Sequence, residues 1–329
     1  MLPQHIFKTQ FYIDFLAQTH PELDICTQRL EGLPSFIASI PIGDALSPKW
    51  PKIIKKLLPK PKALVIGTPF EPYEQSDLLD AKPPKCQVAK HLDWILLHNV
   101  DPYHPNIPLW EEAGFKALPS FPDMQLNIHW KSFHDYLKSL KASVRKSVRQ
   151  NIRKFEQSGF CLETIHDPYE IRHELFKAYE VFWQRAKIPW FKHSPAYFSS
   201  LAQLGTQAQL TIARSPKGET AGFVINFKDL SKSHAGRIGV LPQYDNKHSI
   251  YFRLLYHSIE SAIQANASSL SLGPTGYQLK SRLGAQPRPL SNLVLGTKAP
   301  WRLAFKNLSL FGHLALKHLN NWQNLKQEY

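Results

Sequence analysis

Basic side chains recur at four-residue intervals in one stretch of the sequence, at Lys141, Arg145, Arg149 and Arg153, with no acidic residue between them. Residues four apart lie on one face of a helix, where like charges repel by a few tenths of a kcal/mol per pair. An anion bound across this face would remove that repulsion. The spacing therefore leaves two interpretations open, namely a ridge that binds the phosphates of a substrate or of tRNA, or a solvated basic face.

The other reactive side chains lack the spacing of a known catalytic or metal motif. Cys26, Cys86 and Cys161 are far apart and odd in number, which predicts reduced thiols. The 15 histidines form no HExxH pattern and are not paired with cysteines, so we expect no metal site. Gly-x-Ser-x-Gly, Walker A and Gly-x-Gly-x-x-Gly sequences do not occur either. These observations argue against serine hydrolases, P-loop NTPases and Rossmann dehydrogenases.

Composition predicts a folded protein that attracts anions. The 329 residues are 43% apolar and 20% charged, and the formal net charge is +14. This balance is typical of a globular chain, and the excess of positive charge favours nucleic acid, an acidic membrane face or a phosphorylated substrate as partner. The sequence has neither a segment long and apolar enough to span a membrane nor a leader pattern. We expect a cytoplasmic protein, with a peripheral position at the inner membrane face as the alternative.

The hydrophobic pattern predicts a mixed α/β chain. In the first part we expect helices at 10–18 and 109–113 and strands at 25–30, 35–40, 63–68, 94–100 and 124–128. In the second part we expect helices at 168–185, 249–265 and 277–282 and strands at 209–213, 220–227, 234–240, 268–272 and 290–295. Prolines gather in 48–84 and 102–122, which predicts loops and turns in those stretches.

The clearest predicted helix carries the basic ridge. Ser132 and Asp135 resemble a capping box. An apolar stripe at three- and four-residue spacing follows as far as Phe155, and Gly159 should end the helix. We therefore expect one continuous helix from the Ser132 cap to Gly159.

Two stretches of the chain share a pattern of strand, loop, short helix, glycine and strand. One glycine is Gly114 and the other is Gly284, half a chain apart. A repeat this long indicates a duplicated domain rather than a solenoid.

Three segments together resemble the GNAT acyltransferases and their FemAB-like branch. Residues 237–262, RIGVLPQYDNKHSIYFRLLYHSIESA, are similar to the strand, loop and helix that in GNAT proteins hold a pyrophosphate. Residues 271–285, SLGPTGYQLKSRLGA, are similar to the FemAB-like strand followed by a tyrosine and a Lys-x-x-x-Gly element. The basic helix, with LKASVRKSVR at 140–149, resembles the helix that opens the catalytic half of that branch. The resemblance covers roughly residues 129–297.

The resemblance implies how a donor would bind. A backbone N–H within Ile238, Gly239 and Val240 would hold the carbonyl of the acyl group, and Lys247, His248 and Ser249 would meet the pyrophosphate at a helix start. The two parallel strands beside this site would separate after Val240. Ser249 and Tyr251 stand where the GNAT loop usually has glycine or alanine. Both acyl-CoA and aminoacyl-tRNA, the donor of FemAB-like enzymes, therefore remain open as co-substrates.

The resemblance also implies roles in the transfer itself. Lys280 and Arg282 would bind substrate or stabilise developing charge, and Tyr277 would protonate the leaving group. The candidate bases for the attacking amine are Asp245, Glu219 and His248, and a chain of water molecules could serve instead. Arg145, Arg149 and Arg153 would contact substrate.

The predicted fold is an α/β mixed sheet in two tandem GNAT-like domains, at 1–128 and 129–300, of which the first is degenerate. The predicted function is N-acyl or aminoacyl transfer to an amine of a small molecule or of a cell-envelope precursor. The alternative is a non-catalytic tandem protein that binds nucleic acid or an anionic membrane. The tail 301–329, with apolar and basic residues interleaved, predicts an amphipathic helix, docked on the core or lying on a membrane.

Overall fold

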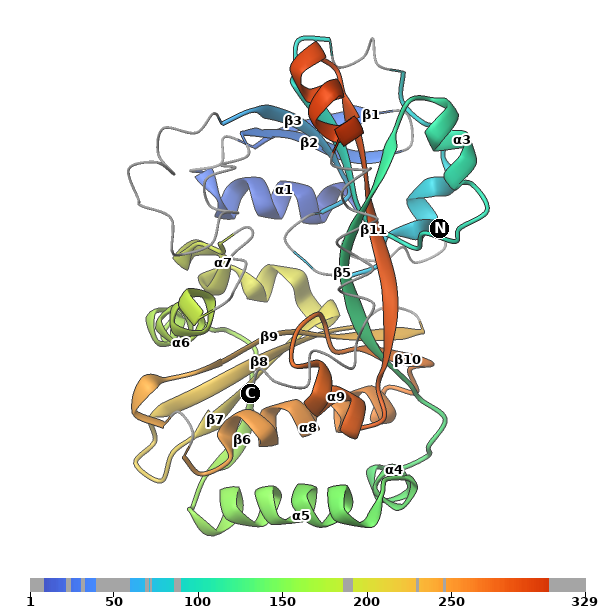
Figure 1. The fold of residues 1–329 in the computed structure, drawn as a ribbon. Coiled ribbons are helices and arrows are strands. Elements are labelled where there is room, and N and C mark those ends of the chain that lie inside the picture. The colour runs from blue at the N-terminus through green and yellow to red at the C-terminus, as the bar shows by residue number, and fades with distance from the viewer. Residues whose placement is uncertain are drawn as a thin grey trace. The chain divides into compact units, whose positions relative to one another are not determined.

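The computed structural model describes residues 9–21, 25–30, 33–39, 60–68, 71, 73–85, 90–185, 192–228, 231–244 and 247–307. They fall into two compact units, coloured by residue number in Figure 1. The carboxyl-terminal unit holds the described residues of Met124–Gly273 and Leu279–Gln286. The amino-terminal unit holds those of Ile6–Asp123, Pro274–Gln278 and Pro287–Tyr329.

The sheet of the amino-terminal unit has the order β1-β2-β3-β4-β11. Its strands are β1 (Cys26–Leu30), β2 (Leu33–Ser39), β3 (Lys62–Ile66), β4 (Trp94–Val100) and β11 (Gln286–Gly296). Only β3 and β4 run parallel, and the other neighbours are antiparallel. Thr9 is the N-cap of helix α1 (Gln10–Thr19), and its hydroxyl accepts a hydrogen bond from the N–H of Tyr12. The core gathers apolar side chains of β3, β4 and β11 around Trp110 and Phe115.

The sheet of the carboxyl-terminal unit has the order β5-β10-β9-β8-β7-β6, in which only β9 and β10 are parallel. Its strands are β6 (Cys161–Ile165), β7 (Ala208–Arg214), β8 (Thr220–Lys228), β9 (Lys232–Val240), β10 (Ser269–Ser271) and, from Met124 onward, β5 (Lys116–Asn127). Helices α6 (Arg172–Arg185) and α7 (Pro195–Ser199) cover one face, and α8 (Ile250–Gln264) covers the other, with α5 (Ala142–Gln157) outside it (Figure 1).

The predicted continuous helix is wrong at its centre. Ser132 caps α4 (Phe133–Ser139) as predicted, but Leu140 and Lys141 leave the helical region with ψ of 152° and 142°. The guanidinium of Arg145 donates to the carbonyls of Lys138 and Leu140, both at 3.1 Å, so it satisfies acceptors left open at the end of α4. Gly159, with φ of 75°, follows the end of α5 as predicted.

One strand is longer than the sequence predicts, because its prolines indicated a loop. The sequence predicts β5 from residue 124, whereas the strand begins at Lys116 and contains Pro119 and Pro122. Its ladder with β10 covers Gln125–Asn127, so both prolines lie outside that ladder. A strand edge without a partner tolerates proline, because no N–H is needed there.

The tail begins as a helix packed on the core. Residues 299–307 are helical. Trp301 and Phe305 contact the ring of Trp94 at centroid distances of 6.0 and 5.2 Å. This part of the tail therefore docks on the core, and 308–329 lie outside the described residues. No described helix is long and apolar enough to cross a membrane. Cys26 and Cys161 are free thiols, while Cys86 lies outside the described residues.

The repeated pattern is matched in detail. Helices α3 (Ile107–Glu112) and α9 (Tyr277–Arg282) start 170 positions apart (277 − 107), and so do β5 and β11 (286 − 116). Between helix and strand, Gly114 and Gly284 have φ of 98° and 93°. The hydrogen bonds that close the turn are equivalent as well: Phe115 N–H donates to Trp110 at 3.1 Å, and Ala285 N–H donates to Lys280 at 3.0 Å.

Candidate active site

The two parallel strands of the carboxyl-terminal unit pair over a short distance and then part. Ser269, Leu270 and Ser271 of β10 pair with Lys232, Ser233 and His234 of β9. From there β9 continues to Val240, bonded to β8 on its other side. The ladder with β10 thus covers only Lys232–His234, the first residues of β9. The strands separate after His234, earlier than the predicted position after Val240.

Three residues predicted to hold the donor lie on β9 beyond this ladder. Ile238 and Val240 pack their side chains toward the core under α8. A Cβ on Gly239 would lie 2.9 Å from the Ala178 carbonyl carbon and 2.5 Å from the Phe223 ring, so α6 can approach this closely only over a glycine. Their side chains therefore have structural roles, and the backbone edge is what they offer a ligand.

A buried lysine lies at the carboxyl end of β10. Lys280 on α9 is 5% exposed, and its ammonium donates to the carbonyl of Gly273 at 3.0 Å. The same carbonyl accepts the N–H of Met124 at 3.3 Å. Arg282, two residues later on the same helix, is exposed. Only the first of these two predicted cations therefore lies in the interior beside the separated strands.

Tyr277 begins α9, one turn before Lys280. Its hydroxyl donates to the Pro122 carbonyl at 3.4 Å. Burial, with a smaller contribution from the nearby Asp123 carboxylate, raises the pKa of Tyr277 to about 12. The phenol therefore stays protonated at neutral pH, as a proton donor must.

Two residues at the start of α8 are hydrogen-bonded to side chains of α5 and of its C-cap. His248 and Ser249 both adopt left-handed backbone conformations, with φ of 54° and 57°. The Ser249 hydroxyl makes no capping bond and donates instead to Asn151 Oδ1 at 3.0 Å. His248 Nδ1 lies 2.9 Å from the Ser158 hydroxyl. The first N–H groups of α8 are thus left without a side-chain cap, next to the exposed Lys247.

The predicted arginine ridge faces away from α8. α5 buries Val144, Val148 and Phe155. Arg149 and Arg153 are exposed on the opposite side of the helix and are separate from the first turn of α8. Arg145 is occupied at the end of α4. The structure therefore does not bring these predicted substrate contacts to the start of α8, and Asp245 lies outside the described residues.

The amino-terminal unit fills the corresponding opening with its own residues. There the parallel pair is β3 and β4, and Gln75 lies between their ends, 1% exposed. Its carboxamide accepts the N–H of Thr68 at 2.8 Å and donates to the carbonyls of Thr68 and His98 at 2.9 and 3.0 Å. A donor could not enter at this point without displacing Gln75.

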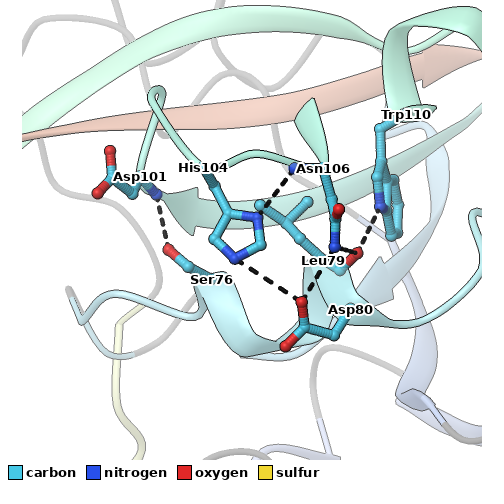
Figure 2. A network of polar contacts seen from close by, with 7 residues as sticks. All are labelled: Ser76, Leu79, Asp80, Asp101, His104, Asn106 and Trp110. Carbon is cyan, nitrogen blue, oxygen red and sulfur yellow. Dashed lines mark hydrogen bonds and ion pairs between the residues drawn. The ribbon is translucent and has the colours of Figure 1, made fainter. Parts of the chain in front are cut away.

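The residue equivalent to Lys280 in this unit is Trp110, 170 positions earlier (280 − 110). Figure 2 shows Trp110 and Asn106 converging on the carbonyl of Leu79, in the 3-10 helix η4 (Ser76–Asp80). Asp80 accepts from Asn106 at 3.0 Å and lies 3.8 Å from His104. The ammonium site of one unit is thus an apolar, hydrogen-bonded contact in the other.

Sequence reasoning missed Gln75 and Asn151. Gln75 gives no local signal, because its side-chain partners, Thr68 and His98, come from two other segments. Asn151 gives one: it is a polar residue at the three-residue spacing of the apolar stripe, after Val148 and before Phe155. A polar side chain on a buried face needs a partner, which here is Ser249 together with the hydroxyl of Tyr256, to which Asn151 donates at 3.1 Å.

Comparison with protein families identifies the carboxyl-terminal unit. Residues 142–281 match the model of the acetyltransferase (GNAT) domain. The match covers less than half of the chain. No curated protein matches the chain. The described residues contain no group of three His, Cys, Asp or Glu side chains that could hold a metal ion.

Solved structures share the fold over most of the chain. FemX aligns with a TM-score of 0.56 and 12% identity, over 92% of this chain and 95% of its own. L-PGS from Bacillus licheniformis aligns with a TM-score of 0.54 and 11% identity, over 93% and 97%. A conserved protein of unknown function from Bacteroides thetaiotaomicron gives a TM-score of 0.53 and 13% identity, over 89% and 92%. At these identities the likeness concerns the fold. It confirms the predicted α/β mixed-sheet fold of the GNAT type.

Proposed function

We propose that the chain transfers an acyl or aminoacyl group from a phosphorylated carrier to an amine. The observation that carries the proposal is the buried side chain of Lys280, which donates to the Gly273 carbonyl just after β10, where the ladder between β9 and β10 ends. A GNAT domain supplies the general chemistry, and L-PGS and FemX are the likenesses that favour an aminoacyl group as one option.

Donor binding would use backbone groups of β9 and α8. Beyond its ladder with β10, the backbone of β9 near Ile238–Val240 could pair with the amides of an extended carrier such as pantetheine, in the manner of an added strand. The uncapped first turn of α8 and the exposed Lys247 offer N–H groups and positive charge to a pyrophosphate. These two features favour acyl-CoA as donor, and aminoacyl-tRNA is the alternative.

The transfer would proceed by direct attack. The neutral amine adds to the carbonyl carbon of the donor, a C–N bond forms, and the carbonyl oxygen becomes an oxyanion. The Lys280 ammonium would stabilise this charge, because a hydrogen-bond donor held in place in a water-poor site lowers the energy of the transition state most where negative charge develops. When the intermediate collapses, the bond to sulfur or to the ribose oxygen breaks. Tyr277, protonated at neutral pH, would give its proton to that leaving group, and the proton of the amine would pass to water.

A pair of variants on α9 tests the proposal. Lys280→Met keeps the length of the side chain and removes its charge, and the Gly273 carbonyl retains its bond from Met124. Arg282→Met removes an exposed charge two residues away and is the matched control. We expect Lys280→Met to lower kcat by about 10²–10³-fold, the usual cost of one oxyanion donor, and Arg282→Met to change it little.

The assay measures thiol release across a panel of acyl-CoA donors and aminoacyl transfer from charged tRNA, with thermal unfolding as a check on folding. Equal activity of two well-folded variants would refute the role of Lys280. Absence of turnover with every donor, combined with tight donor binding, would favour the non-catalytic alternative.

A further inference from the structure

The outer side of α5 presents cations that the protein does not use internally. Lys146, Arg149 and Arg153 are exposed, and none has an ion-pair partner in the described part of the chain. They form, with Arg145, what we call the α5 ridge. The helix has a single acidic residue, Glu156, in its last turn. Because like charges along one helix face repel, the ridge is a surface that an anionic partner would stabilise.

The ridge has a hollow that suits an anionic head group. Its lining is Ala142, Arg145, Lys146, Arg149, Gln150 and Arg153. Four of these six side chains are cationic, and three of them, Lys146, Arg149 and Arg153, are exposed, whereas Arg145 is bonded to the end of α4. Guanidinium groups bind phosphate through two parallel hydrogen bonds. The hollow therefore fits a phosphate that approaches from the solvent side of the helix.

The shape of the ridge favours a flat partner. The helix has 16 residues and is therefore about 24 Å long, and its exposed side can meet a plane along its whole length. Proteins that hold single-stranded RNA add exposed aromatic side chains on which bases stack. The exposed large apolar residues of the described chain are Phe11, Tyr103, Leu109, Tyr169, Phe182 and Leu303, none of them on α4 or α5.

We propose that the α5 ridge docks the protein on an anionic lipid bilayer through lipid phosphates. This partner is additional to the donor and acceptor of the proposed transfer, and the inference does not depend on that reaction. Because the apolar side of α5 is buried in the protein, the helix does not insert. The attachment is therefore electrostatic, reversible and sensitive to salt.

The expected effect of each ridge residue can be stated. One Lys or Arg near an anionic surface contributes about 1 kcal/mol, which is roughly a fivefold change in partitioning. Arg149→Gln combined with Arg153→Gln should therefore weaken binding about 30-fold. Lys177→Gln combined with Lys217→Gln is the matched control, because these exposed lysines lie off α5, on α6 and in the β7–β8 turn, and the net charge falls equally. The control should bind as the unmodified chain does.

The test is co-sedimentation of the full chain with vesicles of phosphatidylcholine, with and without phosphatidylglycerol, at low and high salt. Binding that needs phosphatidylglycerol, falls with salt and is lost in the ridge variant alone would support the proposal. Equal binding to phosphatidylcholine, or equal loss in the ridge and control variants, would overturn it. So would bulk tRNA that binds through the same two arginines more tightly than the vesicles at equal ionic strength. Vesicle binding is measured without donor or acceptor, so failure of the transfer reaction is read separately.

Discussion

The start of α8 allows a sharp test of backbone conformation. Ser249 adopts a left-handed conformation, with φ of 57° and ψ of 29°. A side chain in this region costs about 1–2 kcal/mol, and glycine avoids the cost. Replacing Ser249 by Ala or by Gly removes the same hydroxyl and the same bond to Asn151. The two variants therefore differ mainly in the left-handed penalty and in the greater freedom of glycine in the unfolded chain.

The expected difference follows from these two terms. Relief of the penalty favours Gly by about 1–2 kcal/mol, and the unfolded-state entropy favours Ala by about 0.4–1 kcal/mol. Ser249→Gly should therefore exceed Ser249→Ala in unfolding free energy by roughly 0.5–1 kcal/mol. In an ordinary helix interior, alanine is instead more stable than glycine by about 1 kcal/mol. Gln150, exposed in the middle of α5, provides this reference.

The measurement is urea unfolding of the four variants, compared at constant m. The sign of the Gly-minus-Ala difference should be positive at position 249 and negative at position 150. If Ala is at least as stable as Gly at position 249, Ser249 is not left-handed in solution and the bridge from α5 does not hold the first turn of α8 in the conformation described.

Three further predictions concern stability. Burial lowers the pKa of His20 and of His98 to about 4 each, so as pH falls below about 6.5 the unfolded chain binds protons before the folded chain does. The free energy of unfolding should therefore be highest above pH 6.5 and fall by up to about 3 kcal/mol per histidine by pH 4. Unfolding measured at a series of pH values should show this slope, and replacing both histidines by Gln should flatten it. Gly67→Ala places a Cβ 2.1 Å from the Gln75 side chain at φ of 74° and should cost at least about 2 kcal/mol, and Gln75→Ala in the same chain should recover part of that loss in a double-mutant cycle. Arg145→Gln uncovers the carbonyls at the end of α4 and should cost about 1–2 kcal/mol in thermal unfolding, against about 0.5 kcal/mol or less for an exposed ridge arginine.

Local chemistry decided how much of the fold the sequence could predict. Ser132 and Gly159 mark helix ends correctly, because a cap depends on neighbours within four residues. The break at Leu140 was missed because the apolar stripe continues across it, and leucine and lysine are both good helix formers. What supports the break is Arg145 reaching back to α4, a contact that no periodicity records.

Site residues that belong to a local pattern could also be predicted, whereas those defined by contacts between distant segments could not. Lys280 and Tyr277 could be placed from the sequence, since their order after a strand resembles a known arrangement and α9 has the predicted bounds. The bond from Asn151 to Ser249 spans 98 positions, and such a pairing becomes visible only when the chain folds. Gln75 joins three segments and was beyond reach for the same reason.

The two copies of the strand–helix–strand pattern show how one can lose a site. Trp110 satisfies its indole N–H on the Leu79 carbonyl and fills the core, whereas a buried ammonium such as that of Lys280 is costly wherever it serves no purpose. The amino-terminal unit has Trp110 in place of the lysine, and Gln75 fills the space between the ends of β3 and β4. Within the carboxyl-terminal unit, Gln125–Asn127 of β5 pair with β10, next to the Gly273 carbonyl that accepts from Lys280. A truncation that removes these three residues would therefore expose the edge of β10 beside Lys280.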